Sequence, residues 1–241
     1  MSRSEAQGGA DLALVIPAYR AARTLPGVLA RVRAAVPRAQ VLVVDDGSDD
    51  DTAALAQAGG AAVACHQRNL GKGRALATGL AAAQALGARY VVTMDADGQH
   101  PPECIPALLE PLRSGTTDLV VGSRRRDGGS MPLGRRLTNG LSSALVSRAL
   151  GAVVPDSQSG FRAMRSAVAA AVKPAGRRYE FETEFLFLAA AQGFRIGAVG
   201  VPTVYGSASH FRYLGDTLRL AAVFARYWRR ILAGPGPTSP P

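Results

Sequence analysis

The stretch VTMDADGQHPP, Val92 to Pro102, places two aspartates one residue apart at the end of a β-branched and apolar run. Such a run is typical of a buried strand, and the Gln-His-Pro-Pro that closes the stretch indicates a turn. Side chains two positions apart on a strand point to the same face, so Asp95 and Asp97 are expected to point together beyond the strand's carboxyl end. Two like charges held that close favour a cation. The stretch therefore predicts a cation site at the end of a strand.

Short apolar runs alternate with helical patterns on both sides of this stretch. The runs expected to form strands are DLALVIPAY at 11–19, stopping at Pro17, AQVLVVDDGS at 39–48, AAVACHQ at 61–67, RYVVTMDAD at 89–97 and DLVVGSR at 118–124. Helices are expected after Thr24 as N-cap, with Leu25, Val28, Leu29 and Val32 at helical spacing, before Gly59, from Gly73 to Leu86, and across PECIPALLEPLR at 102–113. This alternation predicts an α/β fold: a single Rossmann-like domain with a mostly parallel central sheet flanked by helices, which binds ligands at the strands' carboxyl ends.

Length and composition are consistent with one such domain. The chain has 241 residues and is 47% hydrophobic, enough for one good core. We expect a flexible N-terminus at 1–10, the catalytic domain at 11–213, an amphipathic basic helix at 214–232 and a disordered Pro-rich tail at 233–241.

Cysteine usage and charge limit the setting and the partners. Cys65 and Cys104 lack metal-ligand spacing and no signal peptide opens the chain, so a cytoplasmic location is expected. The apolar stretches are shorter than the roughly 20 residues that a membrane span requires. A net charge of +10 indicates anionic partners, which include nucleic acid, phosphorylated ligands and an acidic lipid surface. A merely soluble basic surface also explains the charge.

Polar residues follow each of the five expected strands. A turn with a helix N-cap suffices to explain DDGS taken alone, and a solvated turn explains a lone Asp-x-Asp. The Gly-Lys-Gly segment lacks the spacing of a P-loop or of a dinucleotide-binding loop, which disfavours those two nucleotide folds. The five segments nevertheless converge on one edge of the sheet: PAYR, DDGSDDDT, NLGKG, DADGQH and GSRRR.

Six motifs resemble, in order and spacing, those of glycosyltransferase family 2. They are VIPAYR, VLVVDDGSDDDT, NLGKGRALATGL, VVTMDADGQHPPECIPALLE, DLVVGSR and DSQSGFRAMR, spread over about residues 12–206. The resemblance is greatest to the dolichyl- and polyprenyl-phosphate sugar synthases, which have the GT-A fold. It implies an inverting, metal-dependent transfer of mannose or glucose from a GDP- or UDP-linked sugar to a polyprenyl or dolichyl phosphate.

The resemblance also implies a donor site at the first four strand ends. Asp95 and Asp97 match its DxD motif and, with Gln99, are expected to hold Mg²⁺ or Mn²⁺, hard cations that prefer oxygen ligands. His100 is placed in the same site, with a cap of the turn as the alternative. The residues expected to bind the nucleotide sugar are Pro17, Ala18, Tyr19, Asp46, Lys72, Asp95 and Ala96.

The first motif departs from many relatives, which continue it as Pro-Ala-Tyr-Asn-Glu. This chain has Arg20 and Ala21 there. A carboxylate near the nucleotide is lost, so the identity of the base stays open while the expected fold is unaffected.

The acceptor site is inferred from the second half of the resemblance. Transfer to a hydroxyl needs a general base, often a Glu-Asp pair in this fold, whereas this chain has PDSQSGFR at 155–162. A phosphate oxygen is already anionic and needs positive charge to position it, which arginine forks supply. The expected catalytic residues are Asp97, Asp156, Arg124 and Arg136, with Asp156 also the fallback base.

Further residues are expected around the sugar and the acceptor: Arg135, Gln158, Glu182 and Glu184. A solvated basic loop is the alternative for each of the arginines. For the two glutamates, the alternative is an ordinary first turn of a helix.

The segment 214–232, LGDTLRLAAVFARYWRRIL, is expected to form an amphipathic basic helix. One stripe carries Arg219, Arg226 and Arg230, and the other side carries Ala221, Phe224, Trp228 and Ile231. Such a helix either lies on an anionic membrane surface, making the protein peripheral on the cytoplasmic face, or packs on the domain.

Two other functions stay open. One is transfer by a family 2 enzyme to a hydroxyl acceptor in glycan, glycolipid or natural-product synthesis, favoured because no transmembrane helices follow the catalytic segment. The other is a basic nucleic-acid-binding protein, which explains the charge but not the acidic strand ends, and the chain lacks an aromatic-rich binding surface. We therefore expect no nucleic acid partner.

Overall fold

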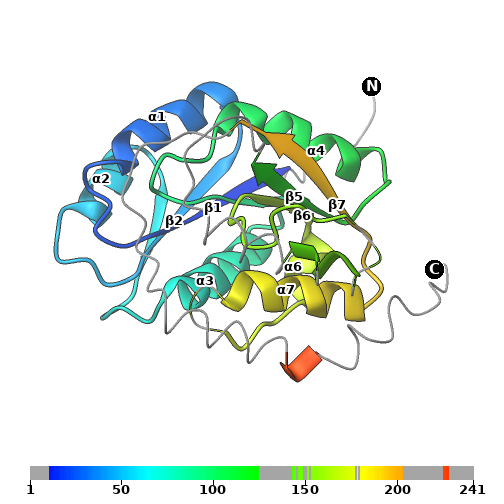
Figure 1. Ribbon diagram of the computed structural model, residues 1–241. Helices are drawn as coiled ribbons and strands as arrows, with labels where there is room; N and C mark the ends of the chain where they lie inside the picture. Colours follow the sequence, from blue (N-terminus) through cyan, green and yellow to red (C-terminus); the bar gives the residue numbers. More distant parts are fainter. Residues whose placement is uncertain are drawn as a thin grey trace, which may run out of the picture.

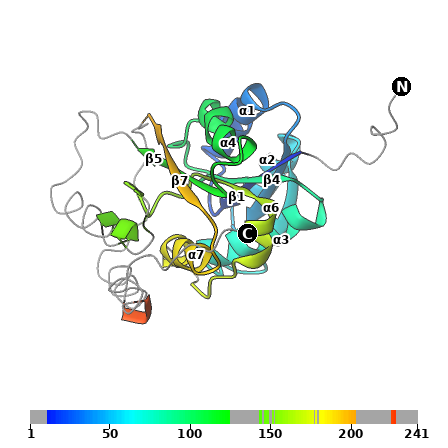
Figure 2. The same cartoon turned by 90° about the vertical axis from the view of Figure 1, so that its right-hand side faces the viewer.

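The computed structural model describes residues 11–124, 143–144, 146–148, 151, 153–176, 178, 180–202 and 225–227. These form a seven-stranded sheet with helices on both faces (Figures 1 and 2). The strand order is β3-β2-β1-β4-β6-β5-β7. The strands are β1 Leu12–Ala18, β2 Gln40–Asp45, β3 Ala62–Cys65, β4 Tyr90–Thr93, β5 Leu119–Arg124, β6 Arg162–Arg165 and β7 Ile196–Val201. The predicted α/β fold is confirmed.

The helices divide between the two faces of the sheet, as Figure 1 shows. On one face, α1, α2 and α4 enclose one buried cluster with the strands; on the other, α3, α6 and α7 enclose a second. Helix α1 buries the Leu25, Val28, Leu29 and Val32 stripe that its spacing predicts. The helices are α1 Leu25–Ala35, α2 Thr52–Ala58, α3 Lys72–Ala85, α4 Ile105–Arg113, α6 Ser166–Ala171 and α7 Glu180–Ala191, with a short 3₁₀ turn, Pro102–Cys104, before α4.

Two strands were not predicted. β6 is antiparallel to both of its neighbours, β4 and β5, while the other strand pairs are parallel. Its sequence, RAMR, is short and has arginine at both ends, so it gives little apolar signal. The edge strand β7, IGAVGV, contains two glycines, which weaken a strand pattern.

The antiparallel β6 brings a later segment to the edge where the parallel strands end. Thr93, the last residue of β4, pairs with Arg162, the first of β6. The Thr93 hydroxyl also donates to the carbonyl oxygen of Gly160 at 2.8 Å. The loop before β6 therefore lies beside the turn that follows β4, which places DSQSG next to the DAD stretch.

Two local expectations need correction. β1 continues through Pro17 to Ala18; it is paired with β4 only as far as Val15, so beyond that point Pro17 has a strand neighbour on one side only. Thr24 precedes α1, but its hydroxyl makes no capping bond and instead donates to the carbonyl oxygen of Ala96 at 2.7 Å. It ties α1 to the DAD turn.

The C-terminal expectations fall largely outside the described residues, as do residues 1–10. Within 214–232 only residues 225–227 are described, and these are helical. Tyr227 stacks on Phe187 of α7, with ring centroids 5.0 Å apart and an angle of 6° between the rings. In the described part of the chain, no helix has the length and hydrophobicity that crossing a membrane requires.

Candidate active site

The aspartates of the opening stretch lie in a tight turn directly after β4. The Asp97 carboxylate accepts a hydrogen bond from the backbone N–H of Gln99 at 2.9 Å, which closes the turn. The backbone N–H of Asp95 donates to Nδ1 of His100 at 3.0 Å, and the His100 ring stacks on Phe161 with centroids 5.2 Å apart. His100 is buried and supports the turn, which is the alternative that the sequence left open for it.

The protonation state of His100 affects the charge of this site. Burial lowers the pKa of His100, although the nearby Asp95 and Asp97 carboxylates act to raise it. A neutral ring that accepts a hydrogen bond at Nδ1 carries its proton on Nε2. His100 therefore adds no positive charge at neutral pH, and another residue must balance the carboxylates.

Lys72 supplies that balance. It begins α3, and its Nζ lies 2.8 Å from Oδ1 of Asp95 and 2.8 Å from Oε1 of Glu182. The backbone of Gly160 lies close against this contact: a Cβ there would stand 2.8 Å from Asp95 Oδ1 and 2.9 Å from Lys72 Nζ. Glycine at position 160 therefore leaves the room that the ammonium and the carboxylate occupy.

Both partners of the Lys72–Asp95 contact are ionised. Burial acts to lower the pKa of Lys72, but Asp95 and Glu182 outweigh it and raise that pKa above its usual value. Burial acts to raise the pKa of Asp95, and Lys72 outweighs this effect and lowers it. The contact between Lys72 and Asp95 is therefore an ion pair at neutral pH.

A second ion pair lies at the end of β5. Nε of Arg124 donates to Oδ2 of Asp156 at 2.7 Å, and a second guanidinium nitrogen donates to Oδ1 at 3.3 Å. Burial acts to lower the pKa of Arg124, but Asp156 and then Asp95 and Asp97 raise it. Two of the expected catalytic residues thus contact each other, within the electrostatic range of the two aspartates after β4.

A pocket of about 530 Å³ opens beside Arg124. Small side chains and short apolar ones line it, and the Val153 side chain is 78% exposed. The lining thus combines one guanidinium with small polar and apolar side chains. Besides Arg124, its lining includes Ser143, Ser147, Val154, Pro155 and Ala198.

The sequence analysis missed Arg162, which fixes the loop before β6. Its buried guanidinium donates to the carbonyl oxygens of Ser159 at 2.9 Å and Ser157 at 3.0 Å. Burial lowers the pKa of Arg162 to about 10, while Glu182 and Asp156 oppose this shift. Arg162 stays charged at neutral pH and fixes the loop that carries Asp156. Its place inside the quoted motif DSQSGFRAMR was the available signal.

The expected nucleotide-binding residues divide into buried and exposed ones. Pro17 and Ala18 are buried at the end of β1, whereas Tyr19 is 42% exposed beside them. The Asp46 carboxylate accepts the backbone N–H groups of Leu70 at 2.9 Å and Gly71 at 2.8 Å. Asp46 therefore fixes the loop that leads into Lys72, and its direct contact with a base stays a prediction.

His66, which the sequence analysis did not single out, completes the surroundings of Asp46. Its Nδ1 lies 2.7 Å from Oδ1 of Asp46, and its Nε2 lies 3.0 Å from the Thr78 hydroxyl of α3. These contacts join the end of β2 to α3. Together with the hydrogen bonds of Asp46, they hold in place the loop that leads into Lys72.

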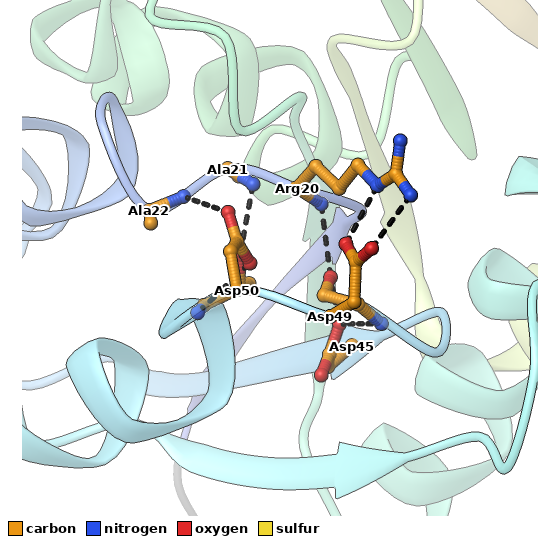
Figure 3. A network of polar contacts seen from close by, with 8 residues as sticks. Arg20, Ala21, Ala22, Asp45, Asp49 and Asp50 are labelled. Carbon is orange, nitrogen blue, oxygen red and sulfur yellow. Dashed lines mark hydrogen bonds and ion pairs between the residues drawn. The ribbon is translucent and has the colours of Figure 1, made fainter.

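Figure 3 shows the polar contacts of Arg20, which stands where many relatives have asparagine in the first motif. Arg20 has a positive φ of 51°, which is uncommon for a residue with a side chain. Its guanidinium makes two 2.7 Å hydrogen bonds to the Asp49 carboxylate, and its backbone N–H donates to the Ser48 hydroxyl at 2.9 Å. Arg20 thus joins the loops after β1 and β2, and its guanidinium lies over the Tyr19 ring.

The remaining expected residues do not gather at one place. Glu184 is turned away from Lys72, because positions two apart on a helix point in nearly opposite directions. Its carboxylate accepts the backbone N–H groups of Ala175 and Gly176 and pairs with Arg226 at 2.9 Å. The structure therefore does not bring Glu184 next to Lys72 and Asp95. Gln158 is half-buried in the loop before β6, while Arg135 and Arg136 lie outside the described residues.

Asp95 and Asp97 fit a divalent cation that takes some of its ligands from the protein and the others from a bound substrate. Among the described residues, no three His, Cys, Asp or Glu side chains are grouped to hold a metal by themselves. Asp95 and Asp97 supply two carboxylates, and Mg²⁺ characteristically uses one or two carboxylates together with substrate phosphates. In the structure a cation, the Lys72 ammonium, already contacts Asp95. The donor set therefore fits Mg²⁺ or Mn²⁺.

A mostly parallel sheet with acidic and basic side chains at its carboxyl edge is an α/β fold with a ligand site where such sheets bind their ligands. The comparison with known families agrees: residues 13–172 match the model of glycosyl transferase family 2. The chain belongs to that family and is a glycosyltransferase. The family resemblance of the six motifs is thereby confirmed.

Individual relatives cover nearly the whole chain. The undecaprenyl-phosphate mannosyltransferase of Micrococcus luteus is 34% identical over 225 residues, 89% of this chain and 92% of that protein. The UDP-N-acetylglucosamine–dolichyl-phosphate N-acetylglucosaminyltransferase of Methanococcus voltae is 32% identical over 80% of this chain and 85% of its own length.

Solved structures support the fold. Glucosyl-3-phosphoglycerate synthase of Mycobacterium tuberculosis, in complex with Mn²⁺, uridine diphosphate and phosphoglyceric acid, superposes with a TM-score of 0.71 at 26% identity. The match covers 92% of this chain and 79% of that one. The expected GT-A fold is confirmed.

Proposed function

We propose that this enzyme transfers a hexose, mannose or glucose, from a GDP- or UDP-linked sugar to a polyprenyl phosphate. The observation that carries the proposal is Arg124, which lines a partly apolar pocket, pairs with Asp156 and is within electrostatic range of Asp95 and Asp97. A guanidinium matches a phosphate head, and short apolar walls match the start of a lipid chain. The names of the relatives from M. luteus and M. voltae, which act on lipid phosphates, support the same acceptor class.

On the donor side, Asp95, Asp97 and Gln99 would hold Mg²⁺ or Mn²⁺, which supplies Lewis-acid stabilisation of the departing nucleoside diphosphate. The Mn²⁺ and uridine diphosphate in the similar M. tuberculosis structure support this assignment. Pro17, Ala18 and Tyr19 would line the nucleotide. Lys72, fixed at the start of α3, would lie near the diphosphate as a permanent positive charge.

On the acceptor side, an anionic phosphate oxygen attacks the anomeric carbon without losing a proton. Arg124 would orient the phosphate, with Arg135 and Arg136 as further candidates. The Asp156 carboxylate, with both oxygens in hydrogen bonds to Arg124, acts in this proposal by fixing that guanidinium rather than as a base.

The proposal is tested with the acceptor. Arg124→Ala and Arg136→Ala should each raise the KM for a polyprenyl phosphate about tenfold or more, since each removes a charge-assisted contact, and should leave nucleotide-sugar affinity within about twofold. Activity should also be more salt-sensitive than donor binding. Transfer to the unphosphorylated polyprenol at the same rate would contradict the proposal.

A hydroxyl acceptor is the second candidate, because the similar M. tuberculosis enzyme was solved with phosphoglyceric acid, a phosphorylated but lipid-free compound.

A thermal-shift panel of GDP- and UDP-sugars with and without Mn²⁺ identifies the donor before the acceptor is known. Nucleic acid belongs in the same panel, since tighter binding of nucleic acid than of any nucleotide sugar would contradict the transferase proposal. We propose a cytoplasmic enzyme that meets its acceptor at the membrane surface.

A further inference from the structure

The two carboxylates that contact Lys72 differ in their access to solvent. The Asp95 side chain is 25% exposed, whereas that of Glu182 is 2% exposed. A ligand that enters from solvent reaches Asp95 and does not reach Glu182. Glu182 is therefore connected to the aspartates after β4 through Lys72, whose Nζ lies 2.8 Å from the Glu182 carboxylate.

The Glu182 carboxylate can accept more hydrogen bonds than it receives in the structure. Apart from the Lys72 ammonium, neither carboxylate oxygen has a hydrogen-bond donor among the described residues, although both are buried. The guanidinium of Arg162 is close enough to affect Glu182 electrostatically, but its hydrogen bonds go to the carbonyl oxygens of Ser157 and Ser159. A buried carboxylate in this state gains from any closer approach of a cation.

A divalent cation at Asp95 and Asp97 would compete directly with Lys72. The ammonium lies 2.8 Å from the Asp95 oxygen, and two cations repel when they share one carboxylate. Moving Lys72 away without a new partner would leave a buried charge unpaired, which is strongly unfavourable. Metal binding at Asp95 therefore requires another site that keeps the ammonium paired.

We infer that Glu182 is a positioning residue that retains the Lys72 ammonium when a divalent cation takes Asp95. Lys72 already contacts both carboxylates, so it shifts its contact to Glu182 without crossing solvent or losing its charge. Asp95 is released for the metal, and Lys72 remains beside it as a fixed positive charge. This inference rests on the proposed metal site, and it replaces the sugar contact that the sequence suggested for Glu182.

The inference is tested by Mn²⁺ binding to the full chain without donor, with free Mn²⁺ measured by electron paramagnetic resonance. Glu182→Gln should weaken Mn²⁺ binding about tenfold, because Lys72 then loses the carboxylate that draws it away from Asp95. Lys72→Met should strengthen binding, since the competing cation is gone. In the Lys72→Met background, adding Glu182→Gln should leave the Kd within about twofold.

Glu184→Gln is the matched control. Glu184 is an equally buried carboxylate on α7, but it contacts Ala175, Gly176 and Arg226 rather than Lys72. Its substitution should leave Mn²⁺ affinity unchanged. If Glu184→Gln weakens binding as much as Glu182→Gln, the effect comes from helix α7 as a whole and the inference fails.

Two further outcomes separate this inference from the proposed function. An equal loss of affinity from Glu182→Gln with and without Lys72 means that Glu182 attracts the metal directly, which overturns the inference but keeps the metal site. A wild-type chain that binds no Mn²⁺ even when uridine diphosphate is also present overturns the metal site itself. If Glu182→Gln alone does not fold, the comparison of Lys72→Met with the double variant decides, because both of those variants lack the buried ammonium.

Discussion

At the scale of single residues, Asp95 and Asp97 have different surroundings although they come from one motif. Asp95 is bound to Lys72 and its backbone to His100, whereas Asp97 accepts a hydrogen bond from the Gln99 backbone. The charge of Asp95 is therefore balanced within the protein. Asp97 is the carboxylate whose charge can be removed with less disturbance to its neighbours.

We predict that Asp97→Asn lowers turnover at least about a hundredfold, because it removes a carboxylate ligand of the cation that stabilises the leaving group. The amide oxygen of asparagine can still accept the Gln99 N–H, so the thermal unfolding temperature should change little. Turnover of a nucleotide sugar at saturating Mn²⁺ is the measurement. An active, metal-independent variant would exclude the proposed role of Asp97.

Single residues also mark the limit of the sequence analysis at the site. The carboxylates and arginines at the strand ends were identified by residue type, and Asp95, Asp97, Lys72, Arg124 and Asp156 do lie at one edge of the sheet. Their partners were not identified. A contact such as Lys72–Glu182 joins residues far apart in the chain, and no local pattern encodes it.

At the scale of elements, α3 carries Lys72 and must lie close to the sheet. A Cβ at Gly79, in the middle of α3, would overlap the Val15 side chain and stand 3.2 Å from Cγ2 of Val44. Val15 is fully buried in β1, so it has little room to move away. The glycine therefore sets the distance between α3 and the sheet, and with it the position of the helix start.

We predict that Gly79→Ala destabilises the protein by about 1–3 kcal/mol through overpacking against Val15. Gly27→Ala in α1 is the matched control, because a Cβ there meets nothing within 4 Å. That change should be stabilising by about 0.5–1 kcal/mol, the helix preference of alanine over glycine. Urea unfolding of both variants measures the difference, and a stabilising Gly79→Ala would contradict the packing argument.

At the scale of the whole molecule, the described part of the C-terminal segment contacts the domain. Arg226 pairs with Glu184, and Tyr227 stacks on Phe187, so both contacts fall on α7. Of the three arginines expected on one stripe of that segment, Arg226 thus has a partner inside the protein. Arg219 and Arg230 lie outside the described residues.

We predict that the protein co-sediments with vesicles containing anionic lipid, and more weakly at high salt. Replacing Arg219 and Arg230 by glutamine should weaken this binding roughly thirtyfold, because each basic residue near such a surface contributes about 1 kcal/mol. Arg226→Gln should weaken it less, since that arginine pairs with Glu184. Removing residues 216–241 should abolish most binding and preserve nucleotide affinity. No sedimentation at low salt, or unfolding of the truncated chain, would show that the segment is part of the core.

The order of β1 to β5 and of the helices between them, the location of the polar residues at these strand ends and the family were determined by the sequence itself. Each rests on local periodicity or on short motifs whose residues are neighbours in the chain. Tertiary structure alone decided that β6 runs antiparallel beside β4, that Gly160 lies against Asp95, and that Glu182 faces Lys72 while Glu184 faces Arg226. These contacts depend on how distant segments pair across the sheet and on the rotation of α7 about its axis, which long-range packing fixes.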